Sequence, residues 1–282
     1  MEPWILYSVI GMFQVSLQMA LFKIPAAKQI DKYQLSTLAF LFASILAGIS
    51  LFNSISFDPK TVLYAFLWGS CYAILALMQM HILHKRETGG VFPFTSLASN
   101  VLVVFGGILF LNEYISHLQW LAIILSALVF IGSYYSNKLH FTGGVLPFFI
   151  LIALLSTVNK FIQKFGSVNT EIHNFIFWQL VFAFITSLLI FIYTKKDRLI
   201  FAKLSSDILL WALLLGVLNL GTNFMVVKAL STGPISLVYT ILGLYTFFTS
   251  IIAAIFFKEK ITARSLSMIL ISFLIILLIK FG

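Results

Sequence analysis

Long apolar runs separated by short polar breaks make up most of this chain of 282 residues. Each run approaches the roughly 20 residues that an α-helix needs to cross the ~30 Å hydrocarbon core of a bilayer. The period-2 alternation of barrel strands is absent, and in lipid the backbone groups must then pair within a helix. We therefore predict an all-α integral membrane protein with ten transmembrane helices. The predicted spans are 4–22, 35–52, 62–83, 92–111, 118–136, 146–164, 175–193, 208–228, 237–257 and 265–280.

The composition supports the bilayer as the solvent of this chain. Hydrophobic residues make up 61%, charged residues only 10%, and the mean hydropathy is +1.05. A water-soluble domain could not cover its surface with so few polar groups. The first apolar run is expected to stay as a membrane helix, because Glu2 stands where a signal peptide has a basic region. Cys71 is the single cysteine, so disulfides are not expected.

The net charge of +9 is spread over short loops, which predicts a membrane topology and no nucleic-acid partner. Loops that follow odd-numbered spans hold 13 of the 18 Lys and Arg residues, and the other side holds 5. The positive-inside rule then places these loops in the cytoplasm and both termini outside.

A short pattern is written twice along the chain. "FLNEYIS" at 110–116 and "FFKEKIT" at 256–262 each lie between the fourth and fifth spans of one half. "ETGG" at 87–90 is matched by "STGP" at 231–234. These repeats predict two five-helix halves, 1–136 and 145–282, joined by a connecting loop at 137–144. An odd number of helices per half inserts the second copy in the opposite direction, which gives inverted repeats with a site near the bilayer midplane.

The repeated heptad, followed each time by a fifth helix, resembles the EamA-like family of the drug/metabolite transporter superfamily over the whole chain. The resemblance implies a permease that works by alternating access, with a cavity lined by the first, third and fourth helices of each half. It also implies cytoplasmic termini, opposite to the charge count. Relatives carry a proline midway along each fourth helix, where this chain has Asn100 and Thr246.

Polar residues inside the spans are the candidates for contact with a solute, because such groups face the bundle interior or a water-filled cavity. Amides on the first, third and fourth helices of each half can both donate and accept, which suits a zwitterionic or polyhydroxylated solute. The alternative use of these amides is hydrogen bonding between helices. The predicted substrate-binding residues are Gln14, Gln18, Trp68, Tyr72, Gln79, Asn100, Asn159, Trp178, Asn219, Asn223, Tyr239 and Tyr245, with Gln163 as a further amide of the same set.

Charged residues near the spans have two interpretations. Lys160 and Lys228 lie just inside span ends, where each either extends to the headgroups or contacts an anionic solute. Glu113 and Glu259 precede a fifth helix and are expected to accept from its free N–H groups. All nine acids lie in loops or at helix ends, which argues against proton exchange through a buried carboxylate. No cofactor and no metal site are predicted, and the coupling ion stays open.

We therefore predict a secondary transporter for a small polar metabolite, amino acid or drug, with no enzymatic activity. Alternatives are a flippase or accessory subunit for a lipid-linked sugar, and a carrier of an anionic nucleotide or sugar phosphate. A membrane-embedded enzyme has the least support, because none of the five histidines pairs with another histidine or an acid inside a span. The expected location is a bacterial inner membrane, with a small-molecule substrate and the lipid bilayer as partners and a monomeric or homodimeric state.

Overall fold

The computed structural model describes residues 2–28, 30–52, 55–85, 91–136, 146–194, 205–257 and 263–282. Within these ranges the chain forms helices and no strand. The helices are α1 (Pro3–Ala27), α2 (Lys32–Ser50), α3 (Pro59–Lys85), α4 (Val91–Leu111), α5 (His117–Ser136), α6 (Leu146–Asn169), α7 (Ile172–Thr194), α8 (Ser206–Thr232), α9 (Ile235–Gly243), α10 (Tyr245–Phe257) and α11 (Ala263–Phe281). Every predicted span coincides with a helix, except that the ninth span is divided between α9 and α10.

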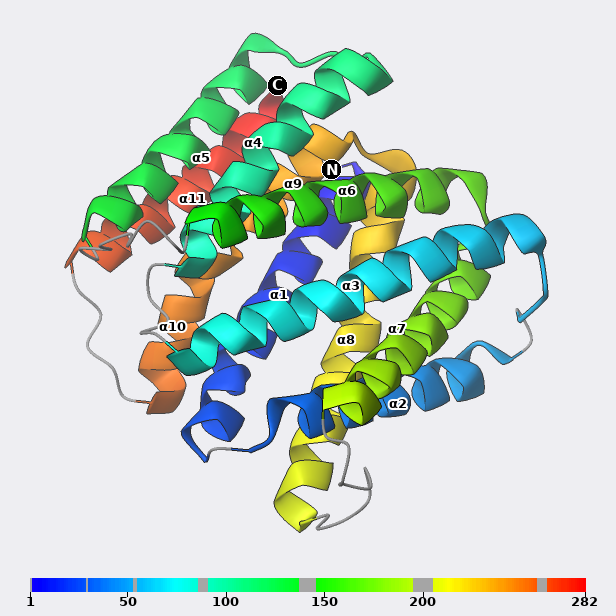
Figure 1. Ribbon diagram of the computed structural model, residues 1–282. Helices are drawn as coiled ribbons and strands as arrows, with labels where there is room; N and C mark the ends of the chain where they lie inside the picture. The colour runs from blue at the N-terminus through cyan, green and yellow to red at the C-terminus, as the bar shows by residue number, and fades with distance from the viewer. Residues whose placement is uncertain are drawn as a thin grey trace.

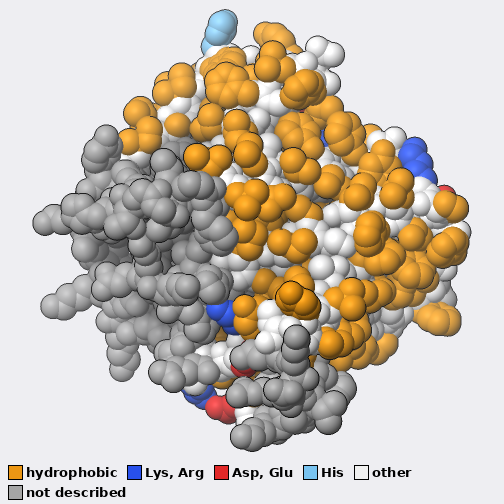
Figure 2. Space-filling model, in the orientation of Figure 1, with side chains coloured by type: hydrophobic (Ala, Val, Ile, Leu, Met, Phe, Trp, Pro, Cys, Tyr) orange, Lys and Arg blue, Asp and Glu red, His pale blue; other side chains and the backbone are white. Residues whose placement is uncertain are grey.

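The surface of the bundle matches a lipid environment. Large apolar side chains point outward along the helices, among them Ile49, Leu189 and Leu270, which are 73%, 62% and 62% exposed. Figure 2 shows hydrophobic side chains over most of the described part of one face, with the few charged ones near its margin. Five helices are long and apolar enough to cross a membrane by themselves, and four shorter apolar helices accompany them among the described residues. The chain is therefore an integral, multi-pass membrane protein.

Helices from the first and second halves of the chain interleave (Figure 1). α2 packs on α7 and α8, and α3 packs on α6 and α7. α1 lies against α8, α9 and α10, α4 against α6 and α9, and α5 against α11. Most of the main contacts of α1–α5 are thus with α6–α11, so any central space is bounded by both groups.

Two glycines let helices of different halves approach closely. A Cβ placed on Gly69 of α3 would lie 2.3 Å from the carbonyl oxygen of Gln179 in α7. A Cβ on Gly216 of α8 would lie 2.9 Å from the carbonyl oxygen of Ala39 in α2. Small residues at crossings allow the close backbone packing on which membrane helices depend.

Acidic and hydroxyl side chains begin several helices. Asp31 accepts from the backbone N–H groups of Tyr33 and Gln34 at the start of α2. Asp58 accepts from Thr61 at the start of α3, and these hydrogen bonds lower the pKa of the Asp58 carboxyl. Ser116 accepts from the backbone N–H of Gln119 at 3.3 Å and so caps the start of α5. Capping explains why acids occur at helix ends.

The ninth span is broken at Leu244 without a proline. The N–H of Leu244 donates to Ile241 and Leu242, and the N–H of Phe247 donates to Leu244, so the helix tightens to three-residue hydrogen bonds. Ser16 of α1 donates its hydroxyl to the carbonyl of Tyr245, the first residue of α10, at 3.1 Å. α4, which the predicted repeat pairs with this span, continues through Asn100 without a break.

Glu113 does not begin its own helix α5, so this prediction was wrong. Its carboxylate accepts from the backbone N–H groups of Ile235 at 2.6 Å and Ser236 at 3.1 Å, and from the Ser236 hydroxyl. It therefore caps α9, a helix of the other half. The free donors of α9 are nearer in space than those of α5, because Gly107 leaves room for Ser236 beside the loop 112–116. Glu259 lies outside the described residues.

Lys164 of α6 binds the other side of the same turn. Its ammonium donates to the carbonyl oxygens of Leu230 at 2.7 Å and Gly233 at 2.9 Å, at the end of α8. A carboxylate on the N-terminus of α9 and a cation on the C-terminus of α8 both complement the helix dipoles. We call this group of Glu113, Lys164 and the turn 230–236 the α8–α9 clamp.

Candidate functional site

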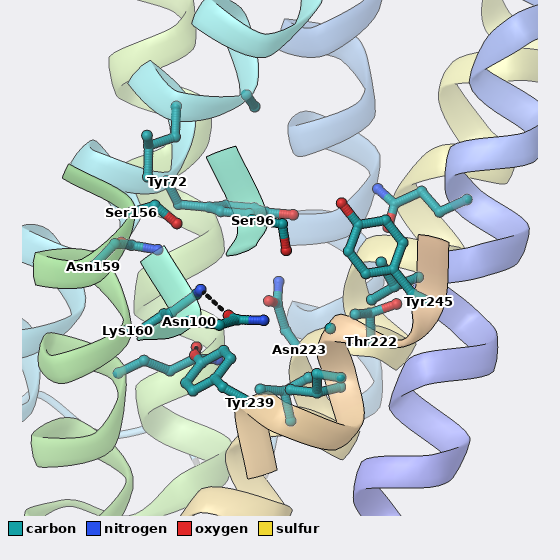
Figure 3. Close-up of a pocket in the computed structure, with 18 of the residues that line it drawn as sticks. Tyr72, Ser96, Asn100, Ser156, Asn159, Lys160, Thr222, Asn223, Tyr239 and Tyr245 are labelled. Atoms are coloured by element: carbon teal, nitrogen blue, oxygen red, sulfur yellow. Dashed lines mark hydrogen bonds between the residues drawn. The ribbon is translucent and has the colours of Figure 1, made fainter. Parts of the chain in front are cut away.

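A cavity of about 200 Å³ lies along the middle of the bundle. It is bounded by α1, α3 and α4 from one half and by α6, α8, α9 and α10 from the other. Its polar lining is Gln18, Trp68, Tyr72, Ser96, Asn100, Ser156, Asn159, Lys160, Gln163, Thr222, Asn223, Tyr239 and Tyr245. The side chains that Figure 3 labels point into one space from several helices.

Lys160 is the cation of this cavity. Its ammonium donates to the Asn100 amide oxygen at 2.6 Å and to the Ser99 hydroxyl at 2.8 Å, both on α4. The same ammonium lies 4.8 Å from the centre of the Tyr239 ring, a cation–π distance. The side chain therefore turns into the bundle and does not extend to the headgroups.

Asn219 connects three helices at the edge of the cavity. Its amide oxygen accepts from Gln18 of α1 at 3.0 Å and from the Tyr72 hydroxyl of α3 at 2.8 Å. On the opposite side of the cavity, the Tyr239 hydroxyl donates to the Gln163 amide oxygen. These bonds hold the lining side chains in fixed orientations.

Two buried polar atoms of lining residues have no hydrogen-bond partner among the described residues. The Asn159 amide oxygen and the Thr222 hydroxyl oxygen are enclosed and make no hydrogen bond within the described residues. Both residues line the cavity. A buried polar atom without a partner costs free energy unless water or a ligand satisfies it.

The structure brings most of the predicted site residues together, while their role in binding stays a prediction. Those that line the cavity are Gln18, Trp68, Tyr72, Asn100, Asn159, Lys160, Asn223, Tyr239 and Tyr245. Gln79 lies on α3, and its side chain is outside the described part of the structure.

Four other predicted residues lie elsewhere. Trp178 donates to the backbone of Ser56 at 2.9 Å, in the loop between α2 and α3. Lys228 lies over the ring of Phe224 at 5.7 Å. Gln14 packs beside Gly221 with its amide oxygen buried, and Asn219 is one layer behind the lining. Each of these residues lies in its predicted span, but its side chain does not line the cavity.

Three lining residues were missed because small hydroxyl residues are common in membrane helices. Ser96 precedes Asn100 by one turn, Ser156 precedes Lys160 by one turn, and Thr222 precedes Asn223. Each therefore shares a helix face, or an adjacent position, with a predicted residue. The positions one helical turn before Asn100 and Asn159 include Ser96 and Ser156, so a search of those positions would identify both.

The chemistry of the lining is that of a binding site. None of the described residues that line the cavity is acidic, and the described part of the chain has no group of His, Cys, Asp and Glu that could hold a metal ion. The lining instead offers one cation with hydroxyl, phenol and amide groups. Such a set can hold a small polar solute by hydrogen bonds and charge.

Comparison with known proteins agrees with this picture. Residues 143–281 match the model described as the EamA-like transporter family. One solved structure, described as "Crystal structure of protein", is similar with a TM-score of 0.76 and 10% sequence identity, and the match covers 97% of this chain and 98% of that chain. At this identity the likeness shows the fold alone. No curated protein matches the chain.

Proposed function

We propose that this chain, which belongs to the EamA-like transporter family of the drug/metabolite transporter superfamily, is a secondary carrier that moves a small polar solute by alternating access. The observation that carries the proposal is the central cavity. Polar groups from both halves line it, midway along the helices. A site at this place can face either side of the membrane when the halves rock against each other.

The contacts between helices support an arrangement as two inverted repeats, 1–136 and 145–282. The predicted repeat pairs α1 with α6, α2 with α7, α3 with α8, α4 with α9 and α5 with α11. Exchanging the two members of each pair turns the α2–α8 contact into the α7–α3 contact. The same exchange turns α1–α8 into α6–α3, and α4–α6 into the contact between α9 and α1. α2–α7, α4–α9 and α5–α11 each map onto themselves, as a two-fold axis in the membrane plane requires.

The α8–α9 clamp supports a closed gate at one end of the cavity. Glu113 comes from the first half and holds the N-terminus of α9, whose residues Tyr239 and Gly243 line the cavity. A charged hydrogen bond that spans the two halves can form in one conformation and break in the other. We propose that this end, which carries both termini, is the closed end in the present conformation.

The size of the cavity favours a small solute over the larger alternatives. A volume of about 200 Å³ is below the ~300–1,000 Å³ of typical pockets for drug-sized ligands. That space suits an amino acid or a small organic acid. A nucleotide sugar or a lipid-linked sugar would need a much wider opening, so the carrier and flippase functions for such cargo have less support.

Filling the cavity tests the carrier function. Ala76 lines the cavity, and Ala76→Trp should abolish transport because the indole occupies the space of the solute. Proteoliposomes would be tested for uptake of radiolabelled amino acids, organic acids, sugars, nucleosides and choline. Leu210→Trp is the matched control, since Leu210 is 53% exposed on the lipid face of α8. Uptake that is equal in the Ala76→Trp protein, or no uptake of any solute, would contradict the proposal.

We further propose a bacterial inner membrane with both termini outside, following the charge count. In a Cys71→Ser background, Ser206→Cys at the start of α8 should be shielded from an impermeant maleimide in intact cells. Tyr114→Cys, at the other end of the bundle and 88% exposed in the wild type, should react. The reverse labelling pattern would place the termini in the cytoplasm.

A further inference from the structure

We propose that the solute of this cavity is a small monocarboxylate, bound through its carboxylate to the ammonium of Lys160. The inference rests on the proposed carrier function and names its substrate class. It starts from the position of Lys160, halfway along α6 and turned into the cavity. Figure 3 shows its ammonium beside Asn159 and Asn100, directed toward the centre of the lining.

Among the described residues, Lys160 has only neutral partners. An ammonium has three N–H donors, and the structure gives this one two acceptors, the Ser99 hydroxyl and the Asn100 amide oxygen. The Tyr239 ring is a third, weaker contact. Charges that are removed from water are normally paired. A cavity that holds a cation and no acid among its described lining residues therefore favours an anionic guest.

Lys160 is not required by the repeated architecture. The position 145 residues earlier, at the same offset that relates Gln18 to Gln163, is Val15. Val15 also lines the cavity. The cavity thus holds an apolar residue in one half where the other half places its cation. A packing role common to both halves does not explain a lysine here, whereas a solute with one negative group does.

The number of cations among the described lining residues selects the kind of anion. The second cationic residue near the site, Lys164, is directed at the carbonyl oxygens of Leu230 and Gly233 and does not line the cavity. One ammonium balances one carboxylate. A phosphate monoester carries about −1.5 to −2 at pH 7 and would keep an unbalanced charge. A carboxylate is therefore favoured over a sugar phosphate or a nucleotide.

The hydroxyl groups of the lining define the rest of the solute. Ser96, Ser156 and Tyr245 line the same cavity, and each can donate and accept a hydrogen bond. A hydroxyl group on the carbon skeleton of the carboxylate would pair with them without adding a charge. The expected class is therefore a small hydroxy monocarboxylate.

Ligand-induced thermal stabilisation of the purified full-length protein tests this class. The probes are lactate, L-alanine, L-serine and 4-aminobutyrate, each paired with its carboxamide, together with glycerol 3-phosphate and glucose. We expect at least one carboxylate to raise the unfolding temperature and its carboxamide to have little effect. The inference is overturned if no carboxylate stabilises the protein, or if an amide or glucose does so equally well.

Variants of Lys160 assign the effect to this side chain. Lys160→Gln should weaken carboxylate binding by roughly 10- to 100-fold, the loss expected for one charged hydrogen bond. Lys160→Arg should keep part of the binding. Lys228→Gln is the matched control, because Lys228 also lies within a helix but does not line the cavity. Unchanged carboxylate affinity in Lys160→Gln would refute the assignment.

Two further results keep the test decisive. Lys160→Met removes a cation that has no anionic partner from the interior, so without ligand this variant should unfold at or above the wild-type temperature. A marked fall in its unfolding temperature would show that Lys160 has a structural role instead. If the wild-type protein transports neutral solutes and Ala76→Trp abolishes that transport, the carboxylate class is refuted but the carrier function stands. If the protein binds a carboxylate but transports no solute, the carrier function is refuted but the carboxylate class stands.

Discussion

Gly69→Ala is expected to prevent this chain from folding into its native bundle. The added methyl would lie 2.3 Å from the carbonyl oxygen of Gln179 and 3.0 Å from the backbone nitrogen of Ala183. Both are backbone atoms of α7, so no side-chain rotation can relieve the overlap. α3 and α7 would have to separate along one of the main contacts between the halves. We expect a loss of about 3 kcal/mol or more in the free energy of unfolding.

Gly48→Ala is the matched control for this experiment. Gly48 also lies in a membrane helix, but its added methyl would meet only a ring carbon of Phe177 at 3.5 Å, an ordinary contact. Alanine is the better helix former by about 1 kcal/mol, so this variant should be as stable as the wild type or more so. Size-exclusion profiles and unfolding temperatures in detergent measure both. A monodisperse Gly69→Ala protein with wild-type stability would show that α3 and α7 are farther apart than described.

Glu113→Ala is expected to slow transport by releasing the closed gate. The carboxylate holds two backbone N–H groups and a hydroxyl of α9, and such charged hydrogen bonds contribute roughly 1.5–3 kcal/mol. Losing about 2 kcal/mol from one conformation shifts the ratio of the two states by about 30-fold. Transport needs both states, so the rate should fall by at least about tenfold.

The shift should also appear as access to the cavity. In a Cys71→Ser background, Ser156→Cys places a thiol in the lining. An impermeant maleimide, supplied from the side that carries the termini, should label it faster when Glu113 is replaced by Ala. Glu171→Ala is the matched control: Glu171 accepts from His173 and Asn174 at the start of its own helix α7 and does not join the halves. It should cost stability without changing the labelling rate. Equal labelling in the wild type and Glu113→Ala would rule out the gate.

The helices were predictable because the bilayer fixes their length and apolar character, while their ends depend on local polar contacts. The span predicted to end at 164 continues as α6 to Asn169. There Ser167 and Asn169 return hydrogen bonds to the backbone of Lys164 and Phe165, so a polar segment stays helical. The sequence therefore placed Lys160 near a membrane surface, whereas the structure places it beside the cavity.

The cavity lining could be predicted only as far as the choice of helices. Amides on the first, third and fourth helices of each half were the right population, and Gln18, Asn100, Asn159 and Asn223 line the cavity. The partner of each side chain depends on contacts between distant segments. Trp178 was misplaced because its N–H meets Ser56 in a loop, and Glu113 because the nearest free helix start belongs to the other half.

The interleaved packing also has a consequence for biogenesis. α1–α5 enter the membrane first, yet most of their main contacts are with α6–α11, which the ribosome makes later. Gln18 and Tyr72 are synthesised before Asn219 of α8, so their hydrogen bonds to Asn219 form only after α8 has been made. Exposed polar groups of this kind are what quality-control proteases and insertion chaperones can bind. The yield of this protein in a cell should therefore depend on how soon synthesis reaches α8.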